Sequence, residues 1–240
     1  MHAFWGELVG TLTLILLGNG VVACVSLKGS YGEGGGWIVV TAGWGLAVLC
    51  AVLVATAIGS NAHLNPAVTI GVSIVRGDWS SAGTYVVAQL LGASLGAVLV
   101  WLHYLPHWRQ TESEGAKRAC FCTSPAVRHA PSNLLTEIIG TFVLVFVAAA
   151  ISSDNLSPTG LAPGFGPLLV GFLVWSIGMS LGGPTGYAIN PARDLGPRLA
   201  HALLPIAGKG ASDWAYAPIP IIGPLMGAAL AGVAVRAIGI

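Results

Sequence analysis

The sequence predicts an all-α membrane protein in which six transmembrane helices and two re-entrant half-helices form an inverted repeat. Three observations lead to this prediction. Of the 240 residues, 55% are hydrophobic and 8% are charged, whereas soluble domains carry roughly 25% charged residues. Long charge-free stretches separate the few charges, and short motifs recur in the two halves of the chain. The composition excludes soluble, nucleic-acid-binding and disordered proteins, and so much apolar sequence also excludes a single-span anchor.

The spans follow from the charge-free stretches, since a spanning helix needs about 20 apolar residues to cross about 30 Å of hydrocarbon. The N-terminus has no basic region and carries Glu7 inside its apolar run, which is typical of a first membrane helix rather than a cleaved signal peptide. We predict six spans, at about residues 4–27, 36–58, 81–103, 134–154, 166–182 and 217–237.

Two apolar stretches are too long for one spanning helix and too short for two. Residues 34–75 leave about 11 residues that start at Asn65, and residues 155–192 run into a second remainder that starts at Asn190. A segment of this length suits a half-helix that enters the bilayer and returns on the same side. We therefore expect one re-entrant half-helix after each of these asparagines.

Three motifs recur in the same order at offsets of 130, 125 and 131 residues. They are Glu-x-x-Gly-Thr at 7–11 and 137–141, Asn-Pro-Ala at 65–67 and 190–192, and Gly-x-x-x-Gly at 92–96 and 223–227. Each half holds three spans, an odd number, so the second half must enter from the opposite face. Inverted repeats of this kind are typical of proteins that move solutes. We predict a first repeat at 1–110, a connecting loop at 111–132 and a second repeat at 133–240.

The two Asn-Pro-Ala motifs predict the centre of a pore. Asn is a good N-cap and Pro suits the first helical position. Non-helical backbone survives at membrane depth only where it is buried in protein or lines a wet cavity. The carbonyls before each motif are therefore expected to face water or hydroxyl groups. The predicted pore-centre residues are Asn65, Pro66, Ala67, Asn190, Pro191 and Ala192. The residues predicted to turn their backbone carbonyls toward the path as hydrogen-bond acceptors are Asn61, Ala62, His63, Leu64, Gly186, Tyr187, Ala188 and Ile189.

The expected charge of this centre is positive. Each half-helix N-terminus carries roughly half a positive charge, and the carboxamides of Asn65 and Asn190 lie at the predicted junction. Such a path admits neutral, hydroxyl-bearing solutes and excludes cations and protons.

Two segments resemble the signatures of the major intrinsic protein (aquaporin) family, in particular its glycerol facilitator or aquaglyceroporin branch. They are His63-Leu-Asn-Pro-Ala-Val-Thr69 and Gly186-Tyr-Ala-Ile-Asn-Pro-Ala-Arg-Asp-Leu-Gly-Pro-Arg198. The resemblance covers the whole chain. It implies a bundle of six helices and two half-helices in the cell membrane, with both termini cytoplasmic. It also implies a homotetramer with one pore per protomer, no cofactor, and glycerol and water as the solutes.

The resemblance also implies a selectivity filter formed by Trp44, Gly178, Tyr187 and Arg193. Strict water channels usually place a histidine at the position of Gly178, and Asp194 and Arg198 resemble markers of the glycerol branch. The residue types agree with this assignment, because two aromatic rings suit the carbon edge of a polyol and an arginine offers a fixed fork of donors to its hydroxyls.

Glu7 and Glu137 have two interpretations. They could couple transport to protons, but their repeat symmetry favours a structural role as acceptors for the backbone of the non-helical loops. The preferred function is thus a passive channel for glycerol and other small neutral solutes. The alternatives are a strict water channel and an ion-coupled secondary transporter. An enzyme is least favoured, since no His/Cys/Asp/Glu cluster has the spacing of metal ligands.

The basic residues do not follow the positive-inside rule if both termini are cytoplasmic. Only Arg76 and Arg236 would then lie inside. Those on the outside would be Lys28, Arg109, Lys117, Arg118, Arg128 and Lys209. The rule counts short loops best, and four of these six lie in the long polar segment 104–132 between the two halves.

Overall fold

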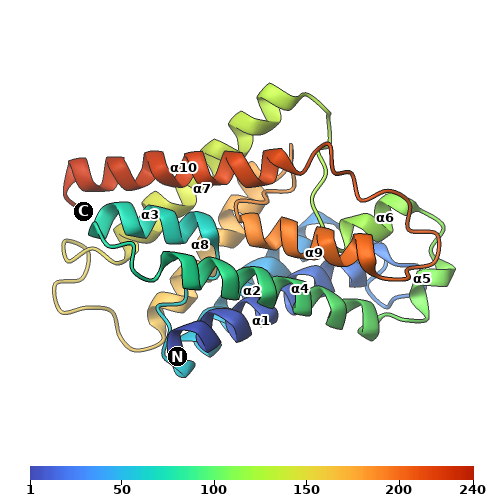
Figure 1. Ribbon diagram of the computed structural model, residues 1–240, viewed down its shortest axis with the longest axis horizontal. Coiled ribbons are helices and arrows are strands. Elements are labelled where there is room, and N and C mark those ends of the chain that lie inside the picture. Colours follow the sequence, from blue (N-terminus) through green and yellow to red (C-terminus); the bar gives the residue numbers. More distant parts are fainter.

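The structure is a computed structural model that describes residues 1–240, and its regular elements are all helices (Figure 1). They are α1 (His2–Ser26), α2 (Gly36–Ile58), α3 (Pro66–Arg76), α4 (Ala82–His103), α5 (His107–Gln110), α6 (Glu114–Ala119), α7 (Ala130–Ile151), α8 (Phe165–Leu181), α9 (Pro191–Leu203) and α10 (Pro218–Ile238). Five helices, α1, α2, α4, α7 and α10, are long and apolar enough to cross a membrane. Helix α8 is equally apolar but has 17 residues, the lower limit for a span.

The predicted spans and half-helices are confirmed, with small shifts at their ends. The largest shift is at α7, which begins at Ala130 rather than near residue 134. Its N-cap, His129, accepts a hydrogen bond from Ser132 N, and Pro131 lies in the first turn, where proline is well tolerated. The helix therefore begins inside the segment that we expected to be loop. The prediction missed this start because it relied on apolar residues, whereas the first turn of α7 is polar.

Glycines let the long helices approach each other closely. A Cβ on Gly92 of α4 would lie 2.2 Å from Leu8 O of α1, and a Cβ on Gly227 of α10 would lie 2.3 Å from Ile138 O of α7. Both crossings use the Gly-x-x-x-Gly motifs of the two repeats, through the first glycine of the motif in α4 and the second in α10. Small residues at helix crossings are the usual means of tight packing in membranes, where lipid provides no hydrophobic drive between helices.

The two half-helices lie nearly end to end in the middle of the molecule (Figure 1). Helix α3 packs on α10 and α9 packs on α4, so each half-helix lies against the last helix of the other repeat. This exchange interlocks the halves and points both helix N-termini at the centre.

The two ends of the molecule differ. The N- and C-termini lie toward one end, together with the loop between α7 and α8, whereas α5, α6 and the C-terminal end of α9 lie at the other (Figure 1). The central loop is therefore folded over the end of the molecule where the second half-helix terminates.

Candidate functional site

The two Asn-Pro-Ala motifs meet through reciprocal hydrogen bonds. The Asn65 side chain accepts from Ala67 N at 2.8 Å, and its Nδ2 donates to Ile189 O at 2.8 Å. In the second repeat, Asn190 accepts from Ala192 N, and its Nδ2 donates to Leu64 O at 2.9 Å. Each asparagine thus caps its own half-helix and holds the carbonyl that precedes the other. One of the two Nδ2–H groups of each amide remains for a solute.

The chain before each motif has the same alternating backbone. Ala62 and Leu64 have φ values of 54° and 53°, and Tyr187 and Ile189 have φ values of 38° and 42°. Non-glycine residues at positive φ are uncommon and cost energy, which is why they concentrate at functional sites. In both repeats they stand one and three residues before the asparagine.

A buried carboxylate fixes each of these loops. Glu7 accepts from His63 N at 2.8 Å and Leu64 N at 2.7 Å. Glu137 accepts from Ala188 N at 3.0 Å and Ile189 N at 2.8 Å. Side chains that the sequence analysis did not identify add to the first site, where Ser60 Oγ and Gln89 Nε2 also donate to Glu7. Neither carboxylate lines the cavity described next.

A cavity of about 820 Å³ extends past both motifs. Its lining includes Asn65, Asn190 and the predicted carbonyl residues except Gly186. The basic side chains in the lining are those of His63, Arg76 and Arg193. No acidic side chain faces the path, so both the helix N-termini and the lining oppose the entry of cations.

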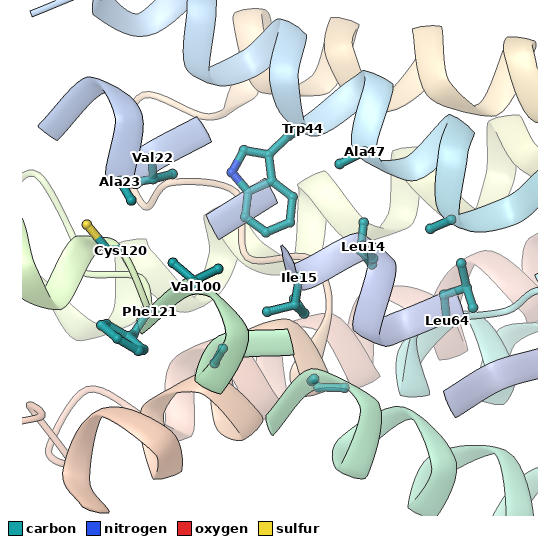
Figure 2. Close-up of a cluster of buried hydrophobic side chains, with 14 of the residues drawn as sticks. Leu14, Ile15, Val22, Ala23, Trp44, Ala47, Leu64, Val100, Cys120 and Phe121 are labelled. Carbon is teal, nitrogen blue, oxygen red and sulfur yellow. The ribbon is translucent and has the colours of Figure 1, made fainter. Parts of the chain in front are cut away.

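Arg193 and two aromatic residues lie where α9 begins. The Arg193 guanidinium stands 4.3 Å from the ring centroid of Trp44, and its Nη1 has no hydrogen-bond partner within the protein. The Trp44 ring projects from α2 toward α1, between Val22 and Leu14 (Figure 2). Trp44, Tyr187 and Arg193 all line the cavity, which therefore has an aromatic wall beside an unoccupied donor.

Two glycines hold the aromatic residues in place. A Cβ on Gly18 of α1 would lie 2.3 Å from Trp44 Cζ3, so the indole rests directly on that helix. A Cβ on Gly178 would lie 2.8 Å from Tyr187 Cζ. Gly178 itself does not line the cavity. It lies behind Tyr187 and leaves room for that ring, a placement that the residue type alone could not specify.

Asp194 and Arg198 form a fully buried ion pair, with Arg198 Nε 2.7 Å from Asp194 Oδ1. Asp194 also accepts from the Thr123 backbone N and side-chain Oγ1, and Arg198 donates to the Ser212 and Asp213 carbonyls. The pair thus ties the central loop and the loop after α9 to the half-helix that carries the arginine of the cavity.

The pair also spans a gap in α9. Pro197 lies inside this helix and has no N–H for the carbonyl four residues earlier, that of Arg193. The neighbouring Cys122 adds no charge here, because burial raises the pKa of its thiol to about 12.

The fold and this site define a membrane channel: an inverted repeat with two half-helices that meet at a positive, hydrogen-bonding centre in the wall of one cavity. The chain belongs to the major intrinsic protein family, whose model matches residues 1–235.

Relatives agree over nearly the full length. The chain is 58% identical to the probable glycerol uptake facilitator protein of Thermotoga maritima, covering 96% of both chains. It is 53% identical to the glycerol uptake facilitator protein of Bacillus subtilis, covering 97% of this chain and 83% of the relative. The X-ray structure of the aquaglyceroporin from Plasmodium falciparum superposes with a TM-score of 0.84 at 30% identity, covering 98% of this chain and 95% of the other.

Proposed function

We propose that this chain is a passive channel that conducts glycerol and other small neutral solutes, passes water, and excludes ions and protons. The observation that carries the proposal is the cavity wall at Arg193, where a free guanidinium donor stands beside Trp44 and Tyr187. A polyol has a carbon edge for the rings and hydroxyls for the guanidinium. The two facilitators that are 53% and 58% identical support glycerol as the solute.

The residue roles in this proposal are those expected from the sequence. Trp44, Gly178, Tyr187 and Arg193 select the solute, with Gly178 acting through the placement of Tyr187. Asn65 and Asn190 orient it at the centre. Glu7 and Glu137 support the loops, a role favoured by their occupied oxygens and their absence from the lining. That absence also argues against an ion-coupled transporter.

The protein is a multi-pass integral membrane protein. We further propose that it lies in the cell membrane with both termini cytoplasmic, that residues 1–110 and 133–240 are its two repeats, and that it assembles as a homotetramer with one pore per protomer. Protease accessibility of tagged termini in oriented vesicles, and cross-linking of the purified protein, test the orientation and the assembly.

Stopped-flow light scattering on proteoliposomes tests the transport function. We expect both water and glycerol permeability to exceed those of protein-free vesicles, with glycerol flux that rises in proportion to concentration and ignores a proton gradient. Water flux without glycerol flux would indicate a strict water channel. Glycerol flux that saturates or follows the proton gradient would indicate a transporter.

A further inference from the structure

At the end of the molecule where α9 terminates, a lysine ammonium occupies the helix end. Lys209 Nζ donates to His201 O at 2.7 Å, Ala202 O at 2.8 Å and Leu204 O at 2.6 Å. The last carbonyls of a helix have no partner within the helix and need one from outside. A single cation therefore closes the end of the half-helix whose other end carries Arg193, and its charge suits the negative end of the helix dipole.

The turn that presents this lysine is itself held by helix α6 of the central loop. Lys117 Nζ, from a side chain that is 3% exposed, donates to the carbonyls of Ala207 and Gly208. A Cβ on Gly208 would lie 3.1 Å from Lys117 Nζ, and a Cβ on Gly210 would lie 2.1 Å from Glu114 Oε2. Both glycines have positive φ, 57° and 68°. The Gly-Lys-Gly turn (residues 208–210) thus fits between two side chains of α6.

Helix α9 depends on such outside support. Its hydrogen-bond ladder is interrupted at Pro197, and the Asp194–Arg198 pair bridges that interruption. The first turn, which carries Arg193, is therefore coupled to the second half of the helix through side chains, and the second half is held at its end by Lys209.

We propose that Lys209 and Lys117 are positioning residues for solute selection: they fix the outer end of α9 and, through it, the guanidinium of Arg193. The inference rests on the proposed channel function. Neither lysine lines the cavity, so their effect on a solute is indirect. This role also accounts for the position of Lys117 and Lys209 at this end of the molecule. Both ammonium groups donate to backbone carbonyls instead of lying free in solvent.

The test compares Lys209→Met, Lys117→Met and Lys209→Arg with Lys28→Met, which removes a lysine from an exposed ion pair with Glu33. Each full-length variant is reconstituted, and water and glycerol permeabilities are normalised to the protein in the vesicles. We expect the glycerol-to-water ratio to fall by roughly threefold to tenfold in Lys209→Met, the scale of one ordinary hydrogen bond, because the lysine acts on the solute only through α9. We expect a smaller fall in Lys117→Met, partial recovery in Lys209→Arg and no change in Lys28→Met.

Hydrogen–deuterium exchange of residues 191–203 gives a readout that needs no solute. We expect faster exchange in Lys209→Met, extending back to Arg193, and unchanged exchange in Lys28→Met. An unchanged permeability ratio in Lys209→Met, with both fluxes reduced equally, would overturn the proposal, as would unchanged exchange at Arg193. Wild-type protein that passes no glycerol would instead refute the proposed function, and the exchange experiment would still decide the role of Lys209.

Discussion

The two loops that lead into the half-helices share one design and differ in how it is supported. Before Asn65 and before Asn190, the same two positions have positive φ, and a carboxylate accepts the two N–H groups nearest the asparagine. Each asparagine then donates to the carbonyl before the other. The features that the two repeats share therefore lie at the centre of the cavity.

The support differs because the first repeat concentrates its donors on its carboxylate. Glu7 accepts from four groups, including Ser60 and Gln89, whereas Glu137 accepts from two backbone groups and has the buried hydroxyl of Thr185 beside it. At the offset of 131, the residue that corresponds to Gln89 is Pro220, which has no side-chain donor.

The second repeat instead concentrates its charges on its half-helix. Arg193, Asp194 and Arg198 are buried on α9, whereas the corresponding residues of α3 at the offset of 125 are Val68, Thr69 and Ser73. The shared features are symmetric about the centre and the charges are not. We therefore propose that the symmetric part conducts and that solute selection belongs to the side that carries the charges.

The largest expected difference between the repeats is in the loss of stability when the buried carboxylate of each repeat is removed. Glu7→Ala leaves four donors without their acceptor and Glu137→Ala leaves two backbone donors and the adjacent Thr185 hydroxyl, at about 1–3 kcal/mol for each buried unsatisfied group. We expect both variants to be destabilised, with the larger fall in thermal unfolding temperature for Glu7→Ala, measured by tryptophan fluorescence in detergent. An equal or larger fall for Glu137→Ala would mean that the donor count does not describe the difference.

The buried ion pair of α9 gives the next largest effect. Asp194→Ala strands the Arg198 guanidinium and should cost about 3–5 kcal/mol. The double variant Asp194→Thr, Arg198→Ser carries the residues of the first repeat, and we expect it to be more stable than the single variant because it leaves no unpaired member of the ion pair buried. Chemical unfolding of both proteins measures this, with Ser73→Ala as a control on α3. A double variant less stable than Asp194→Ala would contradict the interpretation.

Much of this fold could be predicted from the sequence because lipid imposes simple rules. Charge-free stretches gave the six spans, the two remainders at Asn65 and Asn190 gave the half-helices, and the odd number of spans gave the inversion. The start of α7 was missed because a polar cap at His129, rather than apolarity, sets it. The end of α9 at Leu203 could not be predicted from apolarity either, because the buried charged residues of this helix interrupt the apolar pattern.

The site was less predictable because its supports are distant in the sequence. The structural roles of Glu7 and Glu137 were inferred from their equivalent positions in the two repeats. Their contribution to transport remains a prediction. Gln89, Thr123 and Gly18 give no local signal, because each acts on a partner more than 20 residues away. Asp194 and Arg198 were noted only as markers, and their contacts with two loops required the three-dimensional structure.

Replacing the charge that has no counterpart in the first repeat should change selectivity rather than stability. Arg193→Val installs the residue type of Val68 and removes the free donor of the cavity. We expect the solute range to broaden toward larger polyols and the preference for glycerol among them to fall by about tenfold, the value of one charge-assisted contact. Stopped-flow measurements with a series of polyols test this. Unchanged ratios would remove Arg193 from solute selection.

The smallest expected effect tests whether Gly178 acts through Tyr187. In Gly178→Ala the new methyl group would lie 2.8 Å from Tyr187 Cζ and 3.0 Å from Thr41 Cγ2, a strain of about 1–3 kcal/mol that the ring can relieve by moving into the cavity. Because a narrower path hinders the larger solute more, we expect glycerol permeability to fall more than water permeability. Gly183→Ala is the matched control, since a Cβ there meets no atom within 4 Å. If the two solutes lose permeability equally in Gly178→Ala, the glycine serves helix packing alone, and the aromatic wall at Tyr187 does not set the width of the path.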